Sequence, residues 1–562
     1  MQTDTTDIAT RPGRKEHHSP GPAAGRQVVR DPRPGRIALV CCLGPAVAAL
    51  FWAVLSDGFY HDDDIMHYLF AARGWDDWGA LLDRWARPGY NIPAAVAARI
   101  GGLTACRILS VVETAVTSWL AWLIAARIAG RTIWTASAPL LVWAQPLVLT
   151  LSLTTLTETP AAMYLALGVW LYLRGNRVWA CGFWSLLMVT RDETMALAPV
   201  IGAIVVIDAW RSGGGRWLSV PKTWWVWACA GASLWAVAAY WTAAWFVYDD
   251  LHNPANPLAI FLQRYGTEFG RGTWTHFLAS WPLAAGLGVL GLATAGAVAR
   301  PGRSVLVWIF PLGLLVLHTI IYARGMFASG GYPRFLVPAA GLLGALAGVG
   351  LQAVVVGRSR RAIVAMVATM LVVLLRSWQL GRHYVPAELL PMTLTVLIAI
   401  LCVGALLVVL TLSGKPRLRR IAAVGAVGLA AAFIVGQFIP ASGPLRLRDS
   451  AMHRVCLEAL VAARRQRLDL SDALTQHCLI TLETGCRHPR GPQKAAAAWE
   501  RAEAGTLFIW DSKYGTDPME PNGRGALEET VESLGRRIMV VRGDEPGCEI
   551  RLYVKRRGPT TP

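Results

Sequence analysis

The sequence predicts a mainly α-helical protein that crosses a membrane many times and carries a small α/β domain near its C-terminus. Of the 562 residues, 54% are hydrophobic and only 16% are charged, whereas soluble domains usually carry more charge. The apolar residues fall in blocks of roughly 18–24, the length at which an α-helix crosses the hydrocarbon core of a bilayer. After residue 440 this pattern ends and charged residues become frequent, which predicts a separate domain there.

The N-terminal residues 1–36 are rich in Pro, Gly and Arg and show no apolar periodicity. We therefore expect a disordered basic tail. No small-residue cleavage site follows the first apolar block, so we expect this block to stay as a membrane span. The transmembrane region, 37–440, is expected to contain about 13 spans. They are 37–55, 104–127, 132–150, 157–173, 178–190, 194–210, 223–247, 281–299, 304–322, 334–356, 362–379, 389–412 and 421–440.

The segments between these spans alternate in charge. Every second connection is short and basic, for example "RIAGR" at 127–131 and "GKPRLRR" at 414–420. Because basic loops favour the cytoplasmic side, we expect the N-terminus in the cytoplasm and residues 441–562 outside it. The outer loops 56–103 and 248–280 are longer and acidic, which predicts a functional site on the extracytoplasmic face. The net charge of +18 comes mainly from the basic hinges, and no nucleic-acid-binding module is present.

The C-terminal residues 441–562 combine strand and helix patterns. "TLFIWD", "RIMVVRG" and "EIRLYVKRR" predict strands, and "HRVCLEALVAARRQRLD" predicts an amphipathic helix. An oxidising exterior would permit up to two disulfides here, which we favour over a metal site that includes His477 and His488. The four cysteines concerned are Cys456, Cys478, Cys486 and Cys548.

Three consecutive aspartates follow the first span, in "SDGFYHDDDIMHYLF" at 56–70. A helix N-cap with an acidic first turn would explain a single aspartate. Three carboxylates beside His61 and His67 exceed that need, and crowded carboxylates repel each other. We therefore expect at least one of Asp62, Asp63 and Asp64 to have a raised pKa, which suits a general base.

Acids and arginines recur at the outer ends of other spans. Acids suit activation of a hydroxyl group, and the guanidinium fork matches phosphate oxygens. Together they predict a membrane face that binds a lipid phosphate and a hydroxyl acceptor. The residues are Glu158 in "LTTLTETP", Arg191 and Glu193 in "TRDET", Arg264 in the loop 248–280, and Tyr332 and Arg334 in "GGYPRF". Helix capping and an ion pair between Arg191 and Glu193 would account for these acids equally well.

These motifs resemble the GT-C superfamily of polytopic glycosyltransferases that use lipid-phosphate-linked sugars. "YHDDDIMHYLFAARGW" is similar to the His-Pro-Asp-Glu element of the dolichol-type mannosyltransferases, with Asp62 in place of Pro and Asp64 in place of Glu. The stretch from "TETP" to "TRDE" follows the rhythm of the family, with Asp192 where Pro is common. "YPRFLVPA" resembles the start of a late span, and several branches carry an extracytoplasmic C-terminal domain. Over residues 37–350 the resemblance lies in the order and spacing of motifs and spans, and over the remainder it lies in the domain architecture only.

The resemblance implies a GT-C-like fold and an inverting transfer of a hexose or pentose from a polyprenyl phosphate to a hydroxyl of a glycan, lipid or protein. By register with the family motif, Asp63 is the expected general base and Asp62 the alternative. His61 and Asp64 would orient the base or the acceptor. The other implied substrate-binding residues are Arg334, Arg191 and Arg264 for the phosphate, Glu158 and Glu193 for hydroxyl groups, and Tyr332.

The resemblance also implies a bacterial-type plasma or inner membrane and no cofactor, with a divalent metal as the less favoured alternative. Two other functions stay open. A transporter or flippase of a lipid-linked or anionic substrate would place charges deep within spans, where we expect only one acid, Glu113 in "SVVETAVTS". A membrane-anchored binding protein with 441–562 as its active part would leave the outer-face acids unexplained.

Overall fold

The computed structural model describes residues 32–83, 86–248, 271–326, 330–382, 389–413, 415–447, 450–489, 492–512, 526–545 and 547–557. Arg264, most of the predicted loop 248–280 and nearly all of the predicted tail 1–36 lie outside these ranges.

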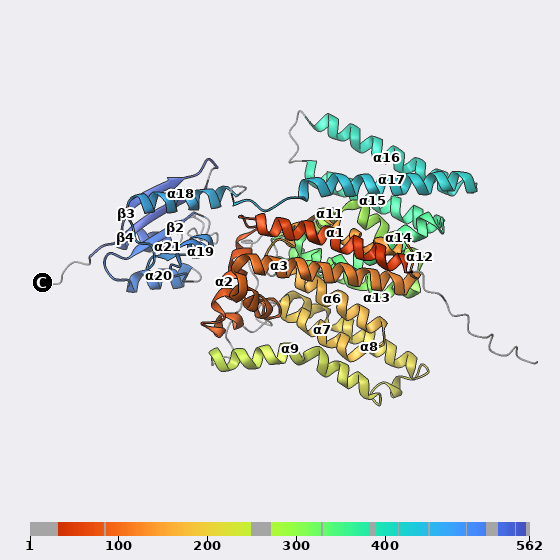
Figure 1. Ribbon diagram of the computed structural model, residues 1–562, viewed down its shortest axis with the longest axis horizontal. Coiled ribbons are helices and arrows are strands. Elements are labelled where there is room, and N and C mark those ends of the chain that lie inside the picture. Colours follow the sequence, from red (N-terminus) through yellow and green to blue (C-terminus); the bar gives the residue numbers. More distant parts are fainter. Residues whose placement is uncertain are drawn as a thin grey trace, which may run out of the picture.

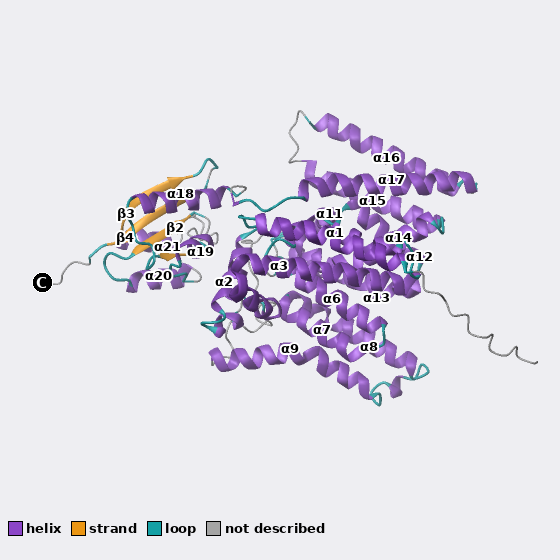
Figure 2. Cartoon of the chain, viewed as in Figure 1, coloured by secondary structure: helices purple, strands orange, loops and turns teal. Residues whose placement is uncertain are grey.

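A bundle of long helices makes up most of the molecule, and a small domain with strands lies at one end of it (Figure 1). Within the described ranges, strands occur only in that domain (Figure 2). The first half of the bundle contains α1 (Arg33–Leu55), α2 (Asp62–Arg73), η1 (Trp78–Leu82), α3 (Pro88–Ala129), η2 (Thr135–Ser137), α4 (Ala138–Trp143), α5 (Pro146–Leu151), α6 (Glu158–Leu173), α7 (Arg177–Thr190), η3 (Asp192–Leu197), α8 (Ala198–Ser212), η4 (Trp217–Ser219) and α9 (Trp224–Tyr248). The second half contains α11 (His276–Ala285), α12 (Leu287–Ala299), α13 (Pro301–Arg324), η6 (Pro333–Ala339), α14 (Ala340–Val355), α15 (Arg360–Gly381), α16 (Leu390–Leu412) and α17 (Pro416–Ala441).

Nine helices of the described chain are long and apolar enough to cross a membrane, or ten if the bent pair α11 and α12 is counted as one span. The prediction of a mainly helical, multi-pass membrane protein is thereby confirmed, while the number of about 13 spans stays a prediction. The segment 132–150 differs from its predicted form. It contains two separate six-residue helices, α4 and α5, because Pro146 disfavours helical geometry at the preceding residue, and Gln145 is extended with ψ of 122°.

The predicted span 281–299 also contains a sharp bend. Helices α11 and α12 meet at 103°, at Gly286 with φ of 78°, a conformation that favours glycine. The side-chain oxygen of Gln437 in α17 accepts a hydrogen bond from the Leu287 N–H at 2.8 Å. This bond satisfies one of the free N–H groups at the start of α12.

The C-terminal domain is a four-stranded sheet with helices on both faces. The strand order is β1-β2-β4-β3, with β1 parallel to β2 and the other pairs antiparallel. Side chains alternate between the faces of a strand: Ile509 packs with α18 and α19, and Phe508 packs with Trp499 of α20. The elements are α18 (Ala451–Arg465), β1 (Leu474–Thr475), α19 (Cys478–Thr484), α20 (Pro492–Arg501), β2 (Leu507–Asp511), α21 (Ala526–Leu534), β3 (Gly535–Arg542) and β4 (Glu549–Lys555).

The cysteines of this domain correct the disulfide prediction. Cys456, Cys478, Cys486 and Cys548 form no disulfide in the structure. The first three are buried in the apolar cluster beneath α18 and α19, and Cys548 packs against its edge. They serve there as small apolar side chains.

Candidate functional site

Helix α2 begins within the aspartate triplet. His61 is its N-cap residue, and the His61 Nδ1 accepts a hydrogen bond from the Asp63 backbone N–H at 3.2 Å. Three carboxylates in the first turn lie at the positive end of the helix dipole, which favours them. Local capping therefore explains why an acidic run starts a helix at this point.

The three carboxylates have three different partners. Asp62 lies 2.9 Å from the His453 ring of α18, Asp63 pairs with Arg334 of η6, and Asp64 accepts a hydrogen bond from the Thr155 N–H at 2.6 Å. Successive residues of an α-helix point roughly 100° apart, so one turn directs the three groups to separate surfaces. The mutual repulsion expected from the sequence is therefore not what shifts their pKa values.

Exposure and pKa distinguish Asp63 from its neighbours. The side chain of Asp63 is 46% exposed and that of Asp62 only 5%, and Asp64 is fully buried. Burial raises the pKa of Asp64 above its usual value. Burial also raises the pKa of Asp63, but the contact with His61 and the charge of Arg334 outweigh it and hold that pKa well below its ordinary range. Asp63 is thus an ionised and accessible carboxylate at neutral pH.

A buried series of ion pairs runs from Asp63 into the bundle. Arg334 lies between Asp63 and Glu158, with its Nε 3.6 Å from Glu158 Oε1. Arg191 Nη1 lies 2.7 Å from the same Glu158 oxygen, and Arg191 also pairs with Glu193. Burying unpaired charges is costly, so alternation of sign is what permits this series in the interior. Five of the residues predicted from distant segments are therefore neighbours in the structure.

The segment η6 adds aromatic rings to this site. The ring of Tyr332 lies 5.6 Å from that of His61, and the guanidinium of Arg334 lies 5.2 Å from the centre of the Tyr332 ring. The guanidinium of Arg191 lies 4.6 Å from the centre of the Phe335 ring. These contacts restrict the orientation of both guanidinium groups.

Both arginines occur where helical geometry is interrupted. Arg191 has extended backbone angles, φ of −143° and ψ of 102°, between α7 and η3. Arg334 lies in the 3₁₀ segment η6, which contains Pro333 and Pro338. Proline restricts the backbone and lacks an N–H, and a 3₁₀ run as long as the seven residues of η6 is uncommon. The proline-containing "YPRFLVPA" therefore brings Arg334 to the end of the bundle where α2 begins.

Several polar residues near this series were not assigned from the sequence. Arg87 forms a buried ion pair with Asp192, the neighbour of Arg191 and Glu193. His67 lies one turn after Asp63 on α2, and burial lowers the pKa of His67 to about 3, so its ring is neutral at pH 7. Its Nδ1 and the amide group of Asn91 are buried and have no hydrogen-bond partner within the described residues. The spacing of four residues between Asp63 and His67 was the available sequence signal.

Other predicted residues lie apart from the accessible carboxylate. Asp62 faces the C-terminal domain, and Asp64 joins α2 to the turn before α6. Glu113 is buried in α3, where Thr159 donates a hydrogen bond to it at 3.1 Å. Arg264 is outside the described residues. Among the described residues, no group of three or more His, Cys, Asp or Glu is arranged to hold a metal ion.

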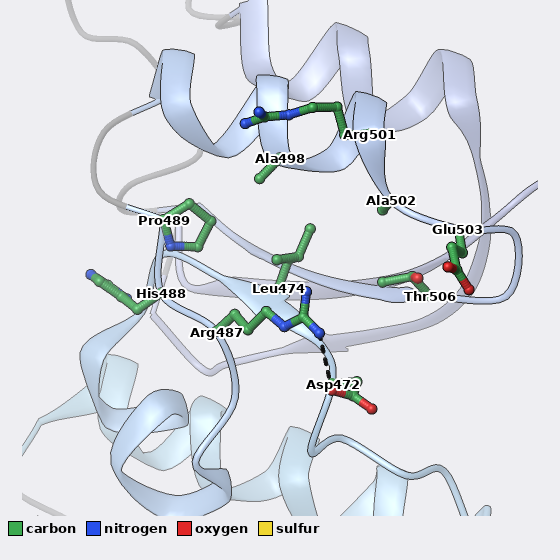
Figure 3. Close-up of a pocket in the computed structure, with 10 residues that line it drawn as sticks. All are labelled: Asp472, Leu474, Arg487, His488, Pro489, Ala498, Arg501, Ala502, Glu503 and Thr506. Atoms are coloured by element: carbon green, nitrogen blue, oxygen red, sulfur yellow. Dashed lines mark hydrogen bonds and ion pairs between the residues drawn. The ribbon is translucent and has the colours of Figure 1, made fainter. Parts of the chain in front are cut away.

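A separate cavity of about 610 Å³ lies in the C-terminal domain, at the β1 edge of the sheet (Figure 3). Its walls include Arg487, His488, Arg501 and Glu503, and Arg487 pairs with Asp472 at 3.3 Å. The side chains of this pair are 71% and 87% exposed. Such solvated charges of both signs do not select a particular ligand, so the buried series beside α2 is the better candidate site.

Comparison of the sequence with protein-family models and with curated proteins gives no match. Among solved structures, the chain is similar to ArnT from Cupriavidus metallidurans bound to undecaprenyl phosphate, with 15% identity and a TM-score of 0.57 over 92% of this chain and 97% of ArnT. The apo state of the same ArnT gives 15% identity and a TM-score of 0.55 over 93% and 98% of the two chains. The chain is therefore a multi-pass membrane protein that shares the fold of ArnT over nearly its whole length.

Proposed function

We propose that the chain is a membrane glycosyltransferase that moves a sugar from a polyprenyl-phosphate donor to a hydroxyl acceptor. ArnT, whose fold it shares, is a GT-C glycosyltransferase, and one ArnT structure holds undecaprenyl phosphate. The single observation that carries the proposal is the contact between the accessible carboxylate of Asp63 and the buried guanidinium of Arg334. Such a transfer needs a base for the hydroxyl and a cation for the departing phosphate.

In the proposed reaction, Asp63 accepts the proton of the acceptor hydroxyl while that oxygen attacks the anomeric carbon of the sugar. The bond between this carbon and the phosphate oxygen breaks, and its electron pair leaves with the polyprenyl phosphate. A single displacement from the opposite side inverts the anomeric configuration. Asp63 is favoured over Asp62 because the Asp62 carboxylate is buried against His453.

Arg334 is the first candidate for the phosphate. In the structure Arg334 pairs with Asp63 and holds the pKa of that carboxyl low, which makes Asp63 a weak base. A bound phosphate would offset the charge of Arg334 and so raise the pKa of Asp63. Donor binding would thereby activate the base for proton transfer.

The surrounding residues take supporting roles in this proposal. Arg191 has two carboxylate partners, Glu158 and Glu193, so it holds Glu158 beside Arg334 and lies behind the phosphate position. His61 contacts Asp63, and the ring of Tyr332 lies against that of His61. The neutral ring of His67 and the amide of Asn91 suit hydroxyl groups of the sugar, because both can donate and accept hydrogen bonds.

We place this end of the bundle on the extracytoplasmic face of a bacterial-type plasma or inner membrane, with the N-terminus in the cytoplasm. Basic hinges at the other ends of the spans support this orientation. For example, α3 is kinked at Gly101 and Gly102, and its second part extends from Arg107, which contacts the chain before α2, to an end next to Arg127 and Arg131. The C-terminal domain would then lie outside the cytoplasm.

A transporter or flippase of the same lipid is the second candidate, because Glu113 is buried within the long helix α3. Charged groups inside spans are typical of transport pathways. Transport of an intact lipid breaks no covalent bond, so the release of free polyprenyl phosphate distinguishes the two functions.

The proposal is tested with membranes that contain the full chain and a panel of labelled undecaprenyl-phosphate hexoses and pentoses. We expect label to pass to an acceptor with the wild type, and Asp63→Asn to lower the rate about 10²–10⁴-fold, the usual contribution of a general base. Asp76→Asn, which changes an exposed acid of the same segment, should keep the wild-type rate.

Full activity of Asp63→Asn would refute the assignment of the base. If Asp62→Asn were then inactive, the base would be Asp62. If both variants retained transfer, or if the wild type moved the lipid without releasing polyprenyl phosphate, the glycosyltransferase proposal would be wrong.

A further inference from the structure

We infer that the C-terminal domain is a structural part of the active site, and that His453 is the positioning residue that connects the two. His453 holds Asp62 and thereby sets the direction in which the next residue, Asp63, faces Arg334. This inference rests on the proposed function. It gives the residues after 450 a role in orienting the base, in addition to the contacts that the bundle makes with α2.

The contact between His453 and Asp62 is buried from solvent. The His453 Nε2 lies 2.9 Å from Asp62 Oδ1, and their side chains are 4% and 5% exposed. The rings of Phe59 and His477 lie 6.3 Å and 6.1 Å from the His453 ring. Bulk water is excluded from this contact. If one partner were removed, water could therefore not take its place unless the surrounding structure rearranged.

The apolar side of α2 lies in the core of the C-terminal domain. Ile65 and Leu69 of α2, together with Phe59 just before the helix, belong to the same buried cluster as side chains of α18, α19 and the sheet. Figure 1 shows the C-terminal domain at the end of the bundle where α2 lies. The helix that presents Asp63 is therefore packed on one side by the bundle and on another by this domain.

The chain before α2 is held in the same way. Leu445, in the linker to α18, accepts hydrogen bonds from the N–H groups of Asp57 and Gly58 at 3.1 and 3.0 Å. A Cβ on Gly58 would meet the backbone of Arg446 at 2.1 Å, so this approach requires glycine. From the bundle side, Arg107 donates to the carbonyl groups of Ser56 and Gly58.

The contacts of Asp62 and Asp64 thus determine the orientation of Asp63 between them. His453 holds Asp62 from the C-terminal domain, and Thr155 holds Asp64 from the bundle. Asp63 is left to face Arg334. Loss of the His453 contact would let the first turn of α2 rotate, and a shift of about 1 Å in a reacting group can lower a rate on the order of 10²-fold.

The test compares His453→Ala, His453→Gln and Leu552→Ala in the full chain. Leu552 is buried in the same cluster, so its truncation destabilises the domain without touching Asp62. We expect His453→Ala to lower kcat at least tenfold with a KM for the donor within about twofold of wild type. His453→Gln, whose amide nitrogen can reach Asp62, should restore most of kcat, and Leu552→Ala should keep kcat per folded molecule.

A second measurement is independent of activity. Hydrogen exchange of the amides in the first turn of α2 should accelerate in His453→Ala but not in Leu552→Ala. In a double-mutant cycle, His453→Ala combined with Asp62→Ala should be no slower than either single variant, because both remove the same contact.

Two outcomes would overturn the inference. One is wild-type kcat for His453→Ala while Asp63→Asn is inactive, which leaves the proposed function intact. The other is an equal loss of kcat in His453→Ala and Leu552→Ala without rescue by His453→Gln, which would reduce His453 to a stabilising residue. Activity of Asp63→Asn would instead refute the proposed function itself.

Discussion

Three adjacent aspartates of identical chemistry occupy three different environments in this protein. Asp62 is buried against the imidazole of His453, Asp64 is buried against Thr155, and Asp63 faces a guanidinium and solvent. Their pKa values accordingly diverge: burial raises that of Asp64, while that of Asp63 is lowered. The partner, and not the number of neighbouring acids, determines what each carboxylate can do.

The lowered pKa of Asp63 gives a prediction for His61. Replacing His61 by Ala or Asn removes a contact that favours the ionised carboxylate, so the pKa of Asp63 should rise. The proposed base acts when ionised, and activity falls as the pH drops through its pKa. The acid limb of the kcat profile, which reports the enzyme with donor bound, should therefore move to higher pH in both variants.

The two variants differ in stability. Asn is a good N-cap residue and Ala is not, so only His61→Ala should lose about 1 kcal/mol of unfolding free energy, measured by thermal unfolding in detergent. An unchanged acid limb in both variants would show that His61 does not influence the pKa of Asp63.

Helix α2 depends on a short link to the turn before α6. The Asp64 carboxylate accepts hydrogen bonds from the Thr155 N–H and hydroxyl, both at 2.6 Å, and from the Tyr60 N–H at 3.2 Å. This link joins two segments about 90 residues apart, which the element boundaries alone would not connect. The broken region of α4 and α5 belongs to the same arrangement, since it leads into the turn that carries Thr155.

The link predicts a measurable loss in Thr155→Val. This substitution removes a buried hydroxyl donor from Asp64 and should lower the free energy of unfolding by about 1–3 kcal/mol. Thr150→Val removes a hydroxyl that donates to a carbonyl one turn earlier in α5, so it is the matched control and should cost less. Equal melting temperatures of the two variants would contradict the role of the link.

The molecule combines a bundle, which holds the arginines, with a C-terminal domain, which packs on the helix that carries Asp63. If the site faces the exterior, the C-terminal domain must lie on that side too, because His453 contacts Asp62 directly. The proposed membrane orientation therefore has to hold for the site and the C-terminal domain together.

Reporter fusions measure this orientation. Alkaline phosphatase fused after residue 562 should be active. Green fluorescent protein fused at the same position should not fluoresce, because it does not mature when it is exported by the Sec pathway. Fluorescent protein fused within the basic hinge 357–361 should fluoresce, because that hinge is expected in the cytoplasm. The opposite pattern would place the aspartate triplet in the cytoplasm and would refute the proposed use of an extracytoplasmic donor.

Hydrophobicity, charge and strand periodicity follow directly from the order of amino acids, which explains why the sequence predicts the membrane class, most spans and three of the strands. The candidate acids and arginines were also recognisable, since charges beside apolar blocks are unusual. Arg87 and Asn91 escaped notice because single polar residues near helix ends are common and carry no pattern of their own. His67 was recognised beside the aspartate triplet but was given no role.

The partner of each aspartate could not be predicted from the sequence. Asp62 and His453 are separated by 391 positions, and Asp63 and Arg334 by 271, so no local signal relates them. The tertiary packing of α2 between the bundle and the C-terminal domain assigns each aspartate its partner, and thereby leaves Asp63 accessible. Composition and spacing are local properties of the chain, whereas burial and electrostatic environment arise only when distant segments meet.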